Sequence, residues 1–266
     1  MTGRQTAGVT ATLHVVGNPG GLFHLRNGIV ISVYSAGSPA PDALLLRSGR
    51  ISKSDWARQS ELVARGAVGS TELQVVAMMA AHDAVFAIVT GEIVDCRLDR
   101  PVDVPLPMTP GVDPVRLLQE TSRRLVSLRS LPVAVSPHLD RVAPAESADP
   151  QEETLTESRR EILQHATGRS SARDIAFAAG RGLFPVTVEV SRMLGEGLLI
   201  VVTHTDGTSV TVTRALRDVP LRPRVTPAPE EPPPVRETDS TGVPLPRSLV
   251  RSLLPRLLNG IWREPN

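Results

Sequence analysis

Residues 155–214 constrain the fold most, because turn and capping signals there separate three short helices from a β-hairpin. Ser171 precedes Asp174 by three residues, the spacing of a capping box, and Gly180 suits a helix C-terminus. Asp206-Gly207 between two apolar runs is typical of a hairpin turn. The expected elements are helices over residues 157–166, 172–179 and 185–196, and strands over residues 198–204 and 209–214.

This order of elements resembles a winged helix-turn-helix domain. Residues 172–176 (ARDIA) resemble the start of that family's second helix, and residues 193–199 (MLGEGLL) resemble the exit of its recognition helix into the wing. The resemblance implies a regulatory domain that can contact DNA, although a fold alone does not establish a function.

The third expected helix has a weak face for reading DNA. At 100° per residue, Val188, Ser191, Arg192 and Gly195 face outward, opposite an apolar stripe. Only Arg192 could pair with guanine through two hydrogen bonds, and Glu189 and Glu196 lie beside it. The candidate DNA contacts at helix ends, on this face and after the wing are Arg169, Arg173, Arg181, Ser191, Arg192 and Arg214. An exposed Val188 would suit a protein partner equally well, so both kinds of partner stay open.

The first 142 residues alternate short strands with helices. Asn27-Gly28 between apolar runs predicts a hairpin, because both residues of such a turn adopt positive φ. The expected strands are residues 12–16, 22–26, 29–35 and 92–98, and the expected helices are residues 41–47, 52–65, 72–89 and 113–128. The long apolar run of the third helix predicts burial on several sides.

Several short motifs in this part resemble the PatA-like domain of unknown function of bacterial signalling and regulatory proteins. They are Gly21-Leu22-Phe23 with Leu25, residues 27–30 (NGIV), residues 42–45 (DALL), the strand near Ile93, and residues 113–120 (DPVRLLQE) leading to Arg123-Arg124. The resemblance covers about the first 130 residues and implies an interaction or sensing module, not an enzyme. Joined to a winged helix-turn-helix, it is similar to actinobacterial transcriptional-regulator-like proteins.

Two proline-containing stretches are predicted to be linkers, which divide the chain into separate parts. The predicted fold class is α+β. The predicted parts are a mixed strand/helix domain (1–142), an acidic linker (143–154), a winged helix-turn-helix domain (155–219), a Pro-rich disordered linker (220–243) and an amphipathic segment (244–266). The last segment has apolar pairs four residues apart and several arginines, so it could fold back, dock on a partner or lie on an anionic membrane. Its candidate partner contacts are Leu254, Leu258 and Trp262.

Residues for catalysis or metal binding are not assembled in any familiar pattern. The six histidines and Cys96 show no metal-ligand spacing, and no phosphate-binding loop or Gly-x-Ser-x-Gly occurs. His82-Asp83 resembles the metal-binding pair of some phosphohydrolases, but it stands alone in an apolar helix. We therefore expect no enzyme activity, no cofactor and no metal.

Composition bears on the cellular location of the protein and on the kinds of partner it can bind. The single cysteine and the lack of an apolar N-terminal run favour the cytoplasm, and no continuous apolar run reaches the ~18–20 residues that span a bilayer. A net charge of +1 argues against DNA binding by overall charge alone. The leading hypothesis is a transcriptional regulator, and the rival is a protein–protein adaptor. A homodimer is also compatible with the sequence.

Overall fold

The computed structural model describes residues 8–58, 62–63, 65–148, 154–205 and 208–212. The fold is α+β, as expected, with two antiparallel four-stranded sheets. The expected Pro-rich linker and amphipathic C-terminal segment lie outside the described residues, as do Arg214, Leu254, Leu258 and Trp262.

The first sheet has the strand order β3-β2-β1-β4. Its strands are β1 (Ala11–Asn18), β2 (Gly21–Arg26), β3 (Ile29–Tyr34) and β4 (Glu92–Asp99). The β2–β3 hairpin is confirmed, and Asn27 and Gly28 both have positive φ, 51° and 78°. Hydrophobic side chains of one sheet face pack against α3 (Ser70–Thr90), whose burial on several sides is also confirmed.

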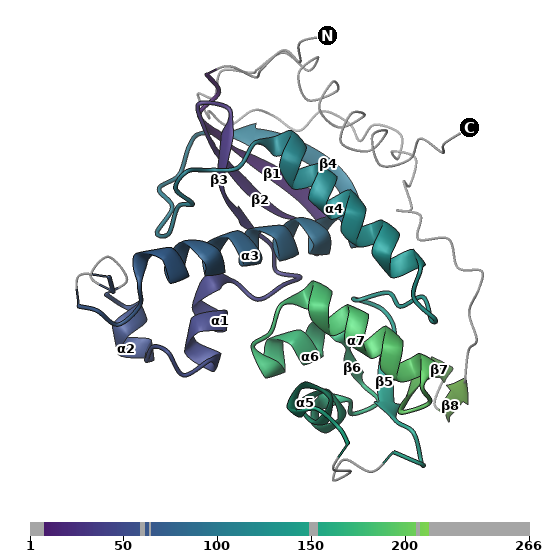
Figure 1. Cartoon of the computed structure of the whole chain (residues 1–266). Coiled ribbons are helices and arrows are strands. Elements are labelled where there is room, and N and C mark those ends of the chain that lie inside the picture. Colours follow the sequence, from purple (N-terminus) through teal and green to yellow (C-terminus); the bar gives the residue numbers. More distant parts are fainter. Residues whose placement is uncertain (1–7, 59–61, 64, 149–153, 206–207, 213–266) are drawn as a thin grey trace, which may run out of the picture.

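Helices α4, α1 and α2 complete the described part of the first unit (Figure 1). Helix α4 (Pro114–Arg129) begins at Asp113, whose side chain accepts the backbone N–H of Val115, and it packs beside α3. Helix α1 (Pro41–Arg47) also packs against α3.

Helix α2 (Lys53–Trp56) is much shorter than the expected helix over residues 52–65. Ser52 and Asp55 form a capping box that starts it, but the chain leaves the helix after one turn. Leu62 and Val68 then pack in a small core cluster with Leu45 of α1. Tertiary burial, rather than helical periodicity, decides where these apolar residues lie.

The second unit contains α5 (Glu157–His165), α6 (Ala172–Ala179) and α7 (Leu183–Gly195), followed by β7 (Leu199–Thr205) and β8 (Thr208–Val212). The capping box between Ser171 and Asp174 is present, and Gly180 ends α6 with φ of 62°. The order of three helices and a hairpin therefore agrees with the expectation. Helix α7 begins two residues before Pro185, because another element satisfies its first N–H groups, as described below.

The acidic stretch expected as a linker begins as a strand. Ala143 and Pro144 belong to β5 (Arg141–Pro144) and pair with Ile200 and Leu199 of β7. Together with the short β6 (Ser170–Ser171), they form a second sheet in the order β6-β5-β7-β8. Backbone pairing thus draws residues 141–144 into the second unit.

The two units share one hydrophobic core. Phe86 and Ala87 of α3 and Leu125 and Leu128 of α4 belong to the same buried cluster as the inner face of α7. Figure 1 shows α6 and α7 below α3 and the C-terminal end of α4. The junction is therefore a packed interface, unlike two domains on a flexible tether.

Helix α3 is long and apolar enough to cross a membrane by length and composition alone, although the sequence has no uninterrupted apolar run of that length. Of the relevant window, 56 % is buried inside the protein. The helix contacts the first sheet, α1, α4 and α7, and its C-terminal half is buried in the core, whereas Val75, Met78 and Met79 nearer its N-terminus are exposed.

Candidate functional site: the covered face of helix α7

The N-terminus of α7 is bound by a carboxylate of α3. Asp83 is 5 % exposed, and its Oδ1 accepts Nη1 of Arg124 at 2.6 Å. The backbone N–H groups of Leu183 and Phe184 also donate to Asp83. Gly182, the N-cap residue, has no side chain to perform this role, and a Cβ there would collide with Asp83. Asp83 therefore caps α7 from a different helix.

Aromatic packing surrounds this ion pair. The rings of Phe86 and Phe184 meet edge to face with centroids 5.4 Å apart. The guanidinium of Arg124 lies 4.9 Å from the centre of the Phe184 ring. Burial raises the pKa of Asp83, although Arg124 and the two N–H groups oppose this shift. We call Asp83, Arg124, Phe86 and Phe184 the α7 latch.

Further along α7, part of the face expected to be exposed is covered, whereas Arg192 and Gly195 are exposed as expected. The hydroxyl of Ser191 is buried and donates to the carbonyl oxygen of Val133 at 2.5 Å. Val188 is half-buried against the shared core, and a Cβ at Gly195 would lie 2.7 Å from Cβ of Pro132. The prediction that Ser191 faces solvent is wrong, and Val188 is only partly exposed, because a helical wheel shows which residues share a face but not what covers it.

The open side of α7 carries paired charges. Arg159 of α5 donates to Glu189 and Glu196, each at 2.6 Å, and these hydrogen bonds raise the pKa of its guanidinium. Arg192 has a 53 % exposed side chain and lies 3.4 Å from Glu189. The two glutamates expected beside Arg192 are therefore present and engaged with arginines.

Two of the other predicted DNA contacts have partners within the protein. Arg181 pairs with Glu161 at 2.6 Å. Arg173 donates to the carbonyl of Ala36 in the first unit at 3.0 Å and lies 5.8 Å from the ring of Phe177. Arg169 is exposed in the turn between α5 and α6. Internal contacts thus occupy most of these arginines.

The segment between α4 and β5 joins the two units. Nε2 of His138 lies 3.0 Å from the carbonyl of Ala87 and 3.1 Å from the hydroxyl of Thr90, at the C-terminal end of α3. Its neighbour Pro137 accepts the backbone N–H of Arg173 in α6. Sequence reasoning missed this role, because nothing near His138 in the chain indicates its distant partners.

Acidification is expected to destabilise the protein through His138. Burial lowers the pKa of His138 below its usual 6.5, so the folded state favours the neutral ring. Its contribution is complete above about pH 6.5 and falls as the pH drops, because the unfolded chain then binds a proton that the folded chain resists. In urea unfolding, the free energy of unfolding should fall more between pH 7.5 and pH 5.5 for the wild type than for His138→Gln. Burial also lowers the pKa of His24 and His82, but this effect is the same in the wild type and in the His138→Gln variant. Equal losses in both would contradict the prediction.

The described residues offer no assembled metal centre. They contain no group of three or more His, Cys, Asp or Glu side chains that could hold a metal ion. The pair His82-Asp83 does not act as a metal site here, since Asp83 is taken up by Arg124 and α7.

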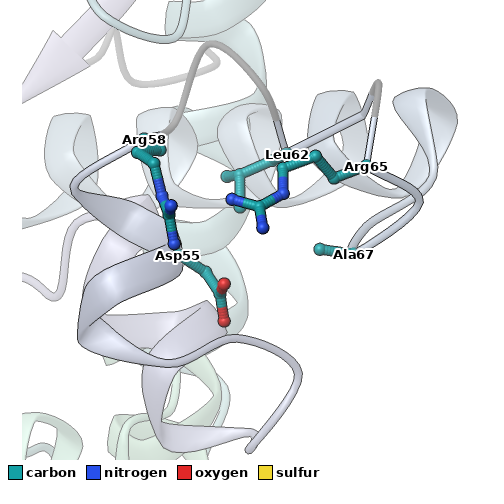
Figure 2. Close-up of a pocket in the computed structure, with 5 residues that line it drawn as sticks. All are labelled: Asp55, Arg58, Leu62, Arg65 and Ala67. Atoms are coloured by element: carbon teal, nitrogen blue, oxygen red, sulfur yellow. The ribbon is translucent and has the colours of Figure 1, made fainter.

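A small surface pocket lies near α2 (Figure 2), lined by Asp55, Arg58, Leu62, Arg65 and Ala67. Ser52 hydrogen-bonds to Asp55 and lowers its pKa, with help from the two arginines. Because Asp55 is held in the α2 capping box, it is not poised as a base.

No protein-family model, no curated protein and no solved structure matches this chain. Its function is therefore inferred from its own residues.

Proposed function

We propose that this protein is a non-enzymatic bacterial regulatory adaptor, in which a PatA-like unit is joined to a winged helix-turn-helix that binds protein rather than DNA. One observation carries the proposal: the N-terminal end of α7 is buried against α3 through the α7 latch. The proposal places the adaptor in the cytoplasm.

The position of α7 argues against its acting as a recognition helix in a DNA groove. In helix-turn-helix proteins, the N-terminal residues of the recognition helix contact base edges. Here the corresponding end of α7 faces Asp83, with Phe184 packed on Phe86. Base edges could reach this end of α7 only if the two units separated.

The charges on the second unit argue the same way. Affinity for DNA comes largely from phosphate contacts by Lys and Arg. Arg159, Arg181 and Arg192 already lie beside glutamates. A surface with so few unengaged cations would bind DNA weakly at physiological salt.

The second unit does present a candidate anchor for a protein. Phe177 on α6 is 42 % exposed, with the guanidinium of Arg173 near its ring. Exposed aromatic and arginine side chains are enriched among the residues that dominate binding energy. Phe177 therefore supports a docking role for α6.

A transcriptional regulator that contacts DNA is the second candidate. The exposed Arg169 and Arg192 favour it, since both side chains could reach phosphates without disturbing the latch.

A salt titration separates these candidates. Fluorescence anisotropy of labelled genomic DNA fragments, from about 20 to 200 mM salt, should show no binding if the adaptor proposal holds. Binding with a steep salt slope that Arg169→Ala and Arg192→Ala both weaken would overturn the adaptor and support the regulator.

Co-purification from the native host tests the adaptor directly. Phe177→Ala should lose a partner that the wild type recovers. Val126→Ala, at an exposed position on α4, is the matched control and should retain that partner. A partner list unchanged by Phe177→Ala would contradict a docking role for α6.

A further inference from the structure

The two edges of the first sheet differ. The outer edge of β3 is covered by the chain after β4: Val30 and Val112 exchange backbone hydrogen bonds of 2.9 and 2.8 Å, and Met108 donates to Ile31 at 2.8 Å. On the opposite edge, β4 pairs with β1 alone among the strands that the structure describes. Edge strands are templates for pairing with another chain.

The outward backbone groups of β4 can be identified. The N–H of Cys96 donates to the side chain of Asp95 at 2.8 Å, so it does not bond to β1. Because backbone groups alternate in direction along a strand, Leu98 also presents its N–H and C=O to the open edge. Asp95 satisfies the Cys96 N–H until another acceptor replaces it.

A β-bulge limits the usable length of this edge. The register moves from Val16 opposite Asp95 to Gly17 opposite Ile93, which leaves Val94 as the extra residue. Val94 is 72 % exposed. The regular part of the edge therefore begins after Val94, at Asp95, and continues toward Asp99.

The sequence of this edge is complementary to itself. Residues 94–98 read Val-Asp-Cys-Arg-Leu. In an antiparallel pair centred on Cys96, Asp95 lies opposite Arg97 of the second copy, and Val94 lies opposite Leu98. Opposite charges facing each other stabilise a strand pair. Moving the centre by one residue, to Asp95 or to Arg97, would instead place that charged residue opposite its own copy, two like charges.

We propose that two copies of this chain associate through antiparallel pairing of their β4 edges, about a two-fold axis at Cys96. The pair forms one continuous eight-stranded sheet, and each copy contributes the same surface. Within one copy, Asp95 and Arg97 lie 3.0 Å apart with side chains 52 % and 70 % exposed. In the pair, each Asp95 lies between two arginines. A ladder this short binds weakly, so we expect association at micromolar concentration.

Sedimentation velocity of the full chain over a micromolar concentration series tests this pairing. The wild type should shift from monomer to dimer. Asp95→Arg and Arg97→Asp should each remain monomeric, because each places like charges opposite one another twice. The double variant D95R/R97D should dimerise again, since exchanging the charges restores both pairs. Asp103→Arg, an exposed charge change after β4, should dimerise like the wild type.

Three outcomes would overturn the proposal. The first is a wild-type monomer at every concentration, and the second is a dimer that neither single change weakens. The third is failure of D95R/R97D to recover while its far-UV circular dichroism matches the wild type. Because pairing of β4 does not depend on whether the second unit binds protein or DNA, these results leave the adaptor proposal to its own tests.

Discussion

Replacing Asp83 with alanine should lower the free energy of unfolding by about 3–5 kcal/mol, as expected for removal of one partner from a buried ion pair. Arg124, with a side chain 17 % exposed, would keep its charge without its closest carboxylate. The first N–H groups of α7 would also lose their cap, since Gly182 has no side chain. Urea unfolding followed by far-UV circular dichroism measures the loss.

Glu120→Ala is the matched control for this prediction. Glu120 accepts Nε of Arg124 at 3.4 Å from a more exposed position, so its removal should cost less than about 1 kcal/mol. The double variant D83A/R124M should lose less than the sum of its single changes, because it leaves no unpaired buried charge. Similar losses for Asp83→Ala and Glu120→Ala would show that Asp83 is not the residue that holds α7.

Replacing Phe86 with alanine should lower the free energy of unfolding by about 3–5 kcal/mol, the usual range for a large-to-small change in a core. Phe86 has 0 % exposure and contacts Phe184 within the core that both units share. Hydrogen exchange should locate the effect: the first turn of α7 should exchange faster while β1 stays protected.

Phe177→Ala provides the comparison, because the same ring is removed from a position that is 42 % exposed. It leaves no enclosed cavity, so its cost should stay near 1 kcal/mol. If Phe86→Ala cost no more than Phe177→Ala, the shared core would not bind the two units together.

Local chemistry made many elements predictable. Asn27-Gly28 determines a hairpin, because few other residues adopt positive φ at both positions of the turn. Ser171 and Asp174 start α6 by bonding each other's backbone N–H, and Gly180 ends it in the left-handed region. Because these effects act within a few residues, they can be predicted from the sequence.

The candidate site was much less predictable. The sequence indicated a third helix with Ser191 on the same side as Arg192, but Ser191 donates to Val133, 58 positions earlier. Asp83 was noted as half of a doubtful metal pair, whereas it caps a helix 100 residues later in the chain. The periodicity of residues within a helix does not indicate which distant residues they contact.

The sequence by itself determined the class of the fold, the order of most elements and the turns and caps that bound them. The tertiary structure decided that residues 141–144 join the second sheet and that Ser191 of α7 is buried against Val133. It also decided that β4, within the described part of the chain, pairs with β1 alone. The physical reason is one of range: caps and turns depend on neighbouring backbone, whereas burial, ion pairing and sheet edges depend on residues that only the folded chain brings together.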